Sequence, residues 1–261
     1  MSPETRDPEQ LAEGTLISHL LELRDRLLRS MIAVLVVFLP LAFFSNQLFT
    51  IIAKPLIDKL PEGNSLIATS VIAPFMTPLK LALFASLFVA MPYVLYQAWA
   101  FVAPGLYRNE KRFALPLFFS SVVLFYAGTA FAYFVVFPLM FKFLAMTTPE
   151  GVKMMTDISS YLDFVVLLFF AFGMAFETPV ATVLLVASGL VSVRTLKKNR
   201  GYVLLGIFVV AAFLTPPDAV SQTAMAVPMY LLYEVGILLG AFVVKDRPVP
   251  QAEEGATNLG E

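Results

Sequence analysis

Residues 201–244, GYVLLGIFVVAAFLTPPDAVSQTAMAVPMYLLYEVGILLGAFVV, contain only two charged side chains, Asp218 and Glu234. A helix needs roughly 20 apolar residues to cross a bilayer, so this stretch is long enough for two crossings. The motif Thr215-Pro216-Pro217-Asp218 divides it, because adjacent prolines cannot continue a helix. The stretch therefore predicts two membrane spans. The first of them, about residues 202–214, rises only about 20 Å and is short for the ~30 Å hydrocarbon core.

Four earlier windows are almost free of charge: residues 30–53, 81–107, 113–141 and 164–193. The whole chain is 59% hydrophobic and only 14% charged, whereas soluble domains carry about 25% charged residues. The sequence thus predicts an all-α polytopic membrane protein with six transmembrane helices. It predicts one six-span domain over residues 30–244, a cytoplasmic amphipathic segment over 1–29, and a disordered cytoplasmic tail over 245–261.

Basic residues indicate how the spans are oriented. Thirteen Lys and Arg residues fall on one set of flanks and five on the other. Because cytoplasmic loops carry the excess of Lys and Arg, both termini are predicted to be cytoplasmic. The first 20 residues hold several acids and no apolar run, so we expect no cleavable secretory signal there.

Prolines interrupt most of the predicted spans: Pro40, Pro92, Pro116, Pro138, Pro179 and Pro228. An interior proline removes a backbone hydrogen bond and kinks a helix. We therefore expect a curved assembly rather than a straight bundle, although kinks that merely face lipid would explain some of these positions.

The residue inventory argues against an enzyme. The single histidine, His19, lies outside the predicted spans, there is no cysteine, and no metalloprotease, phosphate-loop or dinucleotide motif occurs. We expect no catalytic residue, metal or cofactor. A net charge of −1 also argues against nucleic-acid binding, which needs basic charge on one face.

Two acids occupy the basic cytoplasmic flanks, Glu22 before the first span and Glu110 before the third. Glu22 also fits an exposed ion pair with Arg26 four residues later, and Glu110 fits a first-turn acid behind an Asn109 cap. If the two flanks meet, their carboxylates suit a ligand with two adjacent guanidinium groups, because Arg binds carboxylate in a planar, bidentate way.

Further acids lie within or between the spans. Glu177, in an otherwise apolar span two residues before Pro179, is expected to face a cavity, a partner helix or water, or to stay protonated, since a charge at bilayer centre is costly. A structural hydrogen bond to another span is the alternative. Glu234 continues a polar stripe in the last span, for which packing between helices is the alternative. Asp218 fits an N-cap of the sixth helix.

Several stretches resemble one family. They are His19-Leu20-Leu21-Glu22-Leu23-Arg24, residues 96–107 (YQAWAFVAPGLY), Glu110-Lys111-Arg112, residues 172–179 (FGMAFETP) and Leu214-Thr215-Pro216-Pro217-Asp218. In order and distribution they are similar to the TatC family, the signal-receptor subunits of the twin-arginine protein translocation system. The resemblance runs from about Ser18 to Val244.

The resemblance implies a glove-shaped set of six kinked helices, the last two short, in the bacterial inner membrane. It implies receipt of twin-arginine signal peptides of folded cargo at the cytoplasmic face, by Glu22 and Glu110 with Arg24 and Phe101 nearby. Glu177 matches the family's buried glutamate, and Asp218 its outer-loop acid. Thr215 and Gln222 match positions where the single-span partners TatA and TatB dock. A homo-oligomer within a receptor complex and transport driven by the proton gradient are also expected.

Two other classes of function remain open at this point. A proton-coupled solute transporter would also use a buried acid such as Glu177, and usually shows internal repeats, which this chain lacks. A purely structural membrane scaffold would tolerate loss of both cytoplasmic acids.

Overall fold

The computed structural model describes residues 8–57, 66–102, 111–140, 146, 156–214 and 219–245. Its elements in chain order are α1 (Pro8–Phe43), α2 (Ser45–Ile57), β1 (Leu66–Ile67), α3 (Ala73–Val102), α4 (Lys111–Phe131), the π-helix η2 (Ala132–Val136), β2 (Thr156–Asp157), α6 (Ile158–Ala175), α7 (Thr178–Ala187), α8 (Val193–Lys198), α9 (Arg200–Leu214) and α10 (Ala219–Lys245). The two short strands pair in parallel, Leu66 with Thr156 and Ile67 with Asp157. Apart from them the regular structure is helical, which confirms the predicted all-α class.

Five helical stretches of the described chain are long and apolar enough to cross a membrane: Ile17–Phe43, Ala73–Val102, Leu115–Met140, Ile158–Ala187 and Gln222–Phe242. α9 is the shorter apolar helix between the last two. Its 15 residues rise about 22 Å, as predicted for the fifth span. α10 has 27 residues, of which Gln222–Phe242 form an apolar span of 21 residues.

Helix ends differ from the charge-free windows in two places. The predicted window 30–53 is divided, because α1 runs without interruption from Pro8 to Phe43 and α2 begins at Ser45. The helices α3 and α6 also extend past their windows and include Lys80 and Asp163, which the windows excluded. The Lys80 Nζ atom lies 3.0 Å from an Asp163 carboxylate oxygen, and this pairing allows both charges to sit on membrane helices near the end that holds Asp157.

Prolines coincide with irregular helix geometry at two sites. The π-helix η2 ends two residues before Pro138, and the N–H of the intervening Phe137 donates to the Ala132 carbonyl. The helix over 158–187 breaks at Phe176 and Glu177, and Pro179 stands in the first turn of α7. Glu177 therefore lies at a junction between two helices rather than inside one unbroken helix, since Pro179 has no N–H to continue the ladder.

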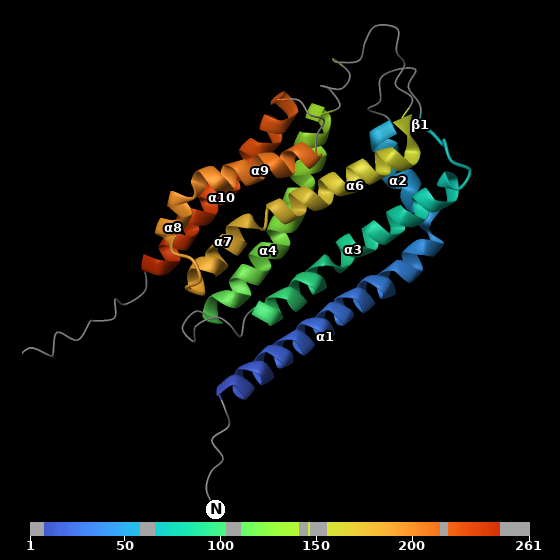
Figure 1. The fold of residues 1–261 in the computed structure, drawn as a ribbon. Coiled ribbons are helices and arrows are strands. Elements are labelled where there is room, and N and C mark those ends of the chain that lie inside the picture. Colours follow the sequence, from blue (N-terminus) through green and yellow to red (C-terminus); the bar gives the residue numbers. More distant parts are fainter. Residues whose placement is uncertain are drawn as a thin grey trace, which may run out of the picture.

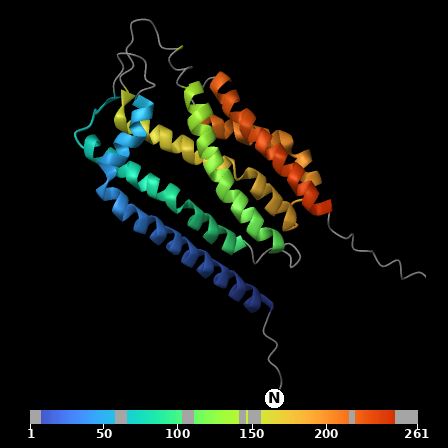
Figure 2. The same cartoon turned by 180° about the vertical axis from the view of Figure 1, so that it is seen from behind.

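The helices form a broad assembly with α1 at one edge. α1 packs on α3, α4 packs on α6, and α10 packs on both α7 and α9. Figures 1 and 2 show α1 beside α3 at one side and α9 and α10 at the other. α1 has no fully buried residue in its described part. Its many exposed apolar side chains fit contact with lipid rather than water.

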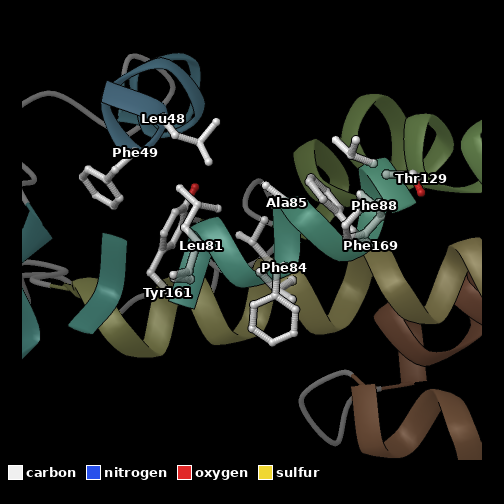
Figure 3. Close-up of a pocket in the computed structure, with 13 residues that line it drawn as sticks. Leu48, Phe49, Leu81, Phe84, Ala85, Phe88, Thr129, Tyr161 and Phe169 are labelled. Carbon is white, nitrogen blue, oxygen red and sulfur yellow. The ribbon is translucent and has the colours of Figure 1, made fainter. Parts of the chain in front are cut away.

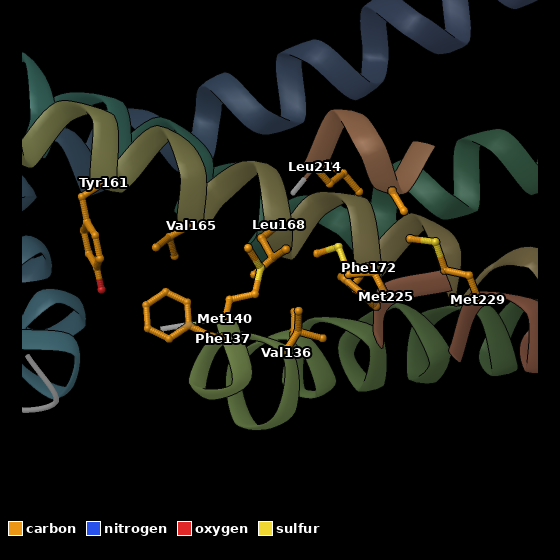
Figure 4. Close-up of a cluster of buried hydrophobic side chains, with 12 residues drawn as sticks. Val136, Phe137, Met140, Tyr161, Val165, Leu168, Phe172, Leu214, Met225 and Met229 are labelled. Atoms are coloured by element: carbon orange, nitrogen blue, oxygen red, sulfur yellow. The ribbon is translucent and has the colours of Figure 1, made fainter. Parts of the chain in front are cut away.

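The largest hydrophobic core joins η2 and the residues after it to α6, α9 and α10 (Figure 4). Its buried members are Ala132, Val136, Phe137, Met140, Tyr161, Val165, Leu168, Phe172, Ala211, Leu214, Met225 and Met229. Close approach of α4 and α6 depends on Gly128 and Gly173. A Cβ on Gly128 would fall onto the Phe172 carbonyl oxygen, and one on Gly173 would lie 2.6 Å from the Phe125 ring.

The N-cap residue of α6, Asp157, lies at the end of the assembly opposite Glu22. One Asp157 carboxylate oxygen accepts hydrogen bonds from the backbone N–H groups of Ser159 and Ser160 at 3.1 Å. The other accepts from the Thr69 N–H and hydroxyl at 3.1 and 2.8 Å. These bonds lower the pKa of Asp157 to about 2, because each donor stabilises the ionised carboxylate. The carboxylate thereby ties the start of α6 to the segment before α3.

Candidate functional site

Glu22 lies in a polar network that joins α1 to α3. Its Oε1 accepts hydrogen bonds from Arg26 Nε at 2.9 Å and from Arg26 Nη2 at 2.6 Å. Its Oε2 lies 3.9 Å from His19 Nδ1. The Glu22 side chain is 38% exposed and that of Arg26 is 21% exposed. The ion pair anticipated from the sequence is therefore present, and Arg26 uses only one of the two carboxylate oxygens.

The network continues across the helix interface. Arg26 Nη1 lies 3.4 Å from Gln97 Oε1, and Gln97 Nε2 donates to the Tyr93 hydroxyl at 2.7 Å. Gln97 is only 4% exposed. Gln97 was not among the predicted site residues, although a lone amide in an apolar span indicates an internal partner, because buried polar groups need hydrogen bonds.

The structure brings Phe101 to the same place. The Phe101 ring stacks on the His19 ring with 4.3 Å between centroids and 21° between planes. Glu22 and Phe101, predicted to act together, are thus linked through His19. Arg24 points elsewhere: its Nε and Nη2 donate to Asp25 Oδ1 at 3.0 and 2.9 Å. We call His19, Glu22, Arg26, Tyr93, Gln97 and Phe101 the α1–α3 network.

Three predicted site residues, Glu110, Thr215 and Asp218, lie outside the described residues. Their neighbours are placed. α3 ends at Val102, directly after Phe101, and α4 begins at Lys111, directly after Glu110. α9 ends at Leu214, directly before Thr215.

Glu177 faces the interior at the break between α6 and α7. Its Oε1 is enclosed and has no hydrogen-bond partner among the described residues. The Ser121 hydroxyl of α4 interacts with the Glu177 carboxyl group. Ser121 is fully buried and also accepts from Trp99 Nε1 at 3.1 Å. Trp99 and Ser121 were not among the predicted site residues, because nothing along the chain shows that residues 99, 121 and 177 converge.

Glu234 has strong partners within the chain. Its Oε2 lies 2.6 Å from Arg200 Nη2, and its Oε1 accepts from the Tyr230 hydroxyl at 2.8 Å. The adjacent Tyr233 hydroxyl donates to the Leu196 carbonyl at 3.0 Å. Glu234 therefore ties α10 to the start of α9, which is the packing role that stood as the alternative for this residue.

Gln222 likewise makes an internal bond. Its Nε2 donates to the Phe208 carbonyl of α9 at 2.9 Å. The predicted docking residue thus connects α10 with α9 and is half-buried.

A wholly apolar cavity of about 360 Å³ lies between α2, α3, α4 and α6 (Figure 3). Its walls are built mainly by two helices, with Leu81, Phe84, Ala85, Phe88 and Val89 from α3 and Tyr161, Leu162, Val165, Val166 and Phe169 from α6. Leu48 and Phe49 of α2 cover one end, and Thr129 of α4 lies at the other. Such a lining suits an apolar chain and offers little to a polar solute.

The described residues contain no group of three or more His, Cys, Asp or Glu side chains that could hold a metal ion. The polar sites of the described residues are instead single acids near guanidinium or hydroxyl groups. This arrangement can bind cationic groups.

Comparison with known proteins agrees with this picture. The family model described as "Sec-independent protein translocase protein (TatC)" matches residues 18–228. The TatC protein of Azotobacter chroococcum mcd 1 is 56% identical over 251 residues, which cover 96% of this chain and 98% of that protein. That of Escherichia coli K12 is 56% identical over 229 residues, covering 88% and 89%.

Solved structures give the same result. The crystal structure of a twin-arginine translocase receptor, TatC, superposes with a TM-score of 0.74 at 37% identity, over 87% of this chain and 99% of that one. A second crystal structure of TatC, in DDM, gives 0.76 at 38% identity, over 85% and 99%. A match over most of the chain in both sequence and fold leaves one conclusion: this multi-span membrane protein belongs to the TatC family of Sec-independent protein translocase components.

Proposed function

We propose that the chain is the receptor core of a twin-arginine export system in the bacterial inner membrane, with both termini in the cytoplasm. It binds the twin-arginine signal peptides of folded cargo at the Glu22 end of the molecule. With TatA and TatB it then moves that cargo outward, driven by the proton gradient. Family membership favours this over a small-solute transporter or a passive scaffold.

The main support for the proposal is the exposure and bonding of the Glu22 carboxylate. Its carboxylate is partly exposed at the cytoplasmic part of α1, beside the stacked His19 and Phe101 rings, and its Oε2 is not bonded to Arg26. A signal arginine can therefore reach this oxygen. A hydrogen bond to a charged group contributes about 1.5–3 kcal/mol, so two such contacts distinguish a pair of arginines from other pairs.

Glu110 is the proposed partner for the second arginine. The segment that carries it leaves α3 directly after Phe101, which contacts His19, and returns at Lys111. The eight residues 103–110 therefore begin at the α1–α3 network, which supports a shared site. Arg24, exposed and paired only with its neighbour Asp25 among the described side chains, is proposed to contact the signal backbone or its acidic groups.

Beyond the arginines, we propose that the apolar region of the signal follows the membrane interior past Glu177 towards the cavity of Figure 3. Phe169 lines that cavity and lies eight residues before Glu177, about 12 Å along a helix. The unpartnered Glu177 oxygen and the short α9 would thin the bilayer locally and favour recruitment of TatA.

TatA and TatB are proposed to dock where α9 meets α10, at Thr215 and Gln222, with Asp218 in the outer loop. Gln222 supports this because its amide N–H donates to α9 while its side chain remains only half-buried. Several copies of the chain would join in one receptor complex.

The first test is photocrosslinking of an Arg-Arg signal peptide to membranes that carry Glu22→Gln or Glu110→Gln. We expect each variant to lose at least ten-fold in crosslinking, while Asp163→Asn, an acid that pairs with Lys80 at the other end, keeps its yield. Unchanged crosslinking in both Glu variants would remove the binding role.

The second test uses the absence of cysteine from the chain. A thiol-reactive group in the apolar region of the signal should label Ala85→Cys, which lines the cavity, and not Leu83→Cys, which points out of it on the same helix. Equal labelling of both would place the apolar region elsewhere.

A further inference from the structure

The carboxylate proposed to receive a signal arginine already holds an arginine of its own chain. Arg26 directs both Nε and Nη2 at Glu22 Oε1, at 2.9 and 2.6 Å. These donor atoms are the ones that an incoming guanidinium would use, but both are directed at a single oxygen rather than at the two oxygens of a bidentate pair. Arg26 is also largely shielded, with 21% of its side chain exposed, so the pair is not a loose surface contact.

Charge balance at this end of α1 makes the pairing consequential. Between His19 and Ser30 the helix carries three arginines and two acids, and Arg24 pairs with Asp25 as Arg26 pairs with Glu22. This segment therefore offers no net negative charge to a cationic peptide. Its Glu22 carboxylate can bind an incoming guanidinium through both oxygens only when Arg26 withdraws from Oε1.

Gln97 offers an alternative acceptor for Arg26 when it leaves Glu22. The Arg26 Nη1 atom already lies 3.4 Å from Gln97 Oε1, a long contact that can shorten. The Gln97 amide is fixed in orientation because its Nε2 donates to Tyr93 at 2.7 Å and the side chain is buried. A guanidinium has five N–H donors in a rigid fork, so Arg26 can transfer donors to Gln97 without becoming unsatisfied.

We propose that Arg26 is an internal placeholder on Glu22, a guanidinium that the signal's arginine must displace from Oε1 before it can pair with both carboxylate oxygens. This rests on the proposed function of Glu22. Because Arg26 must be displaced, the affinity of every cationic peptide falls by the same factor. Peptides with one arginine or with lysines then bind too weakly to remain on the protein. A twin-arginine signal still binds, because its second arginine makes a further contact with Glu110.

The proposal predicts the sign of a mutation effect. Arg26→Gln should tighten binding, because the competitor is gone. An ion pair of this kind contributes up to about 1 kcal/mol, so the Kd for an Arg-Arg signal peptide should fall about two- to five-fold. The Kd for the matching Lys-Lys peptide should fall by the same factor. A residue that only holds α1 against α3 would instead weaken binding when replaced.

The experiment is fluorescence titration of both peptides against the full chain in membrane vesicles. Arg29→Gln, the loss of an exposed arginine one turn further along α1, corrects for the general change in charge. Arg26→Lys is the second variant. It keeps the charge and helix with a weaker contact, and should tighten binding by a smaller factor even if Arg26→Gln proves unstable.

The outcomes separate the two claims. If Glu22→Gln abolishes signal binding and the Arg26 variants bind more weakly than or the same as Arg29→Gln, the placeholder role is overturned and the receptor role stands. If Glu22→Gln leaves signal binding unchanged, the receptor role itself fails. Tightening in Arg26→Gln that disappears in the Glu22→Gln background supports both.

Discussion

Three acids, two on helices and one at a break between helices, have very different surroundings in this chain. Glu22 meets Arg26 one helical turn away, and Glu234 meets Arg200, 34 residues earlier. Glu177 keeps one oxygen enclosed without a partner. The first pairing is readable from the sequence because it spans four residues on one helix. The second is not, because it depends on how α9 and α10 pack.

The Arg200–Glu234 pair is expected to stabilise the contact between α9 and α10. Glu234→Gln and Arg200→Gln should each lower the free energy of unfolding by about 1 kcal/mol. The double variant should cost less than the sum of the two, with a coupling of about 0.5–1 kcal/mol. Denaturant unfolding in detergent micelles measures this, with Tyr230→Phe as a control that removes only the hydroxyl bond to Glu234. Additive effects would show that the pair does not couple the helices.

Asp157 is expected to make stability fall in strong acid. Its folded pKa of about 2 lies below the usual 3.8 because donors from Thr69 and Ser160 stabilise the carboxylate. A depressed carboxyl pKa contributes stability that is full above about pH 4 and is lost as the pH falls towards 2. The melting temperature of the wild type should therefore drop more steeply between pH 4 and 2 than that of Asp157→Asn. Parallel curves would contradict the assignment.

At the scale of elements, the backbone breaks follow proline and the close contacts follow glycine. The sequence showed that Pro179 and Pro138 disturb their spans, but not that one disturbance is a break at Glu177 and the other a π-bulge over Ala132–Val136. The close contacts follow glycine, because a Cβ on Gly128 would collide with α6 and a Cβ on Gly173 would collide with the Phe125 ring of α4.

The glycine contact gives a matched pair of variants. Gly128→Ala should destabilise the protein by about 1–3 kcal/mol, because the new Cβ meets the Phe172 backbone oxygen, which cannot move freely. Gly206→Ala, in α9, has open space around its Cβ position and should be neutral or stabilising by up to about 1 kcal/mol. Thermal unfolding of both variants tests the contact. An equal loss in the two would mean that helix propensity, not packing, decides the outcome.

For the molecule as a whole, composition and charge placement predict the class and the approximate helices, and the apolar windows overlap all the described membrane helices. Composition and charge placement do not predict where the helices end. Lys80 and Asp163 lie outside the windows but inside helices, because each neutralises the other. The α1–α3 network was only partly predictable for a related reason. Glu22 and Phe101 come from sequence motifs, whereas Gln97 and Tyr93 acquire their role from the side of α3 that α1 covers.

The predicted orientation is testable on the same cysteine-free chain. Ser70→Cys, exposed near the start of α3, should react with a membrane-impermeant maleimide added to intact cells. Lys198→Cys, exposed at the end of α8, should react only after the membrane is opened. This follows from the excess of Lys and Arg on the α8 side. Reaction of Lys198→Cys in intact cells would reverse the topology.

The position of α1 at the edge of the assembly also affects how the chain inserts into the membrane during synthesis. Because α1 contributes no fully buried residue in its described part, it can enter the bilayer as soon as it leaves the ribosome, with lipid as its only neighbour. The main core, by contrast, needs Met225 and Met229 as well as Ala132. A nascent chain halted before residue 219 therefore holds inserted helices without a closed interior, and protease resistance is expected to arrive only when the final helix emerges.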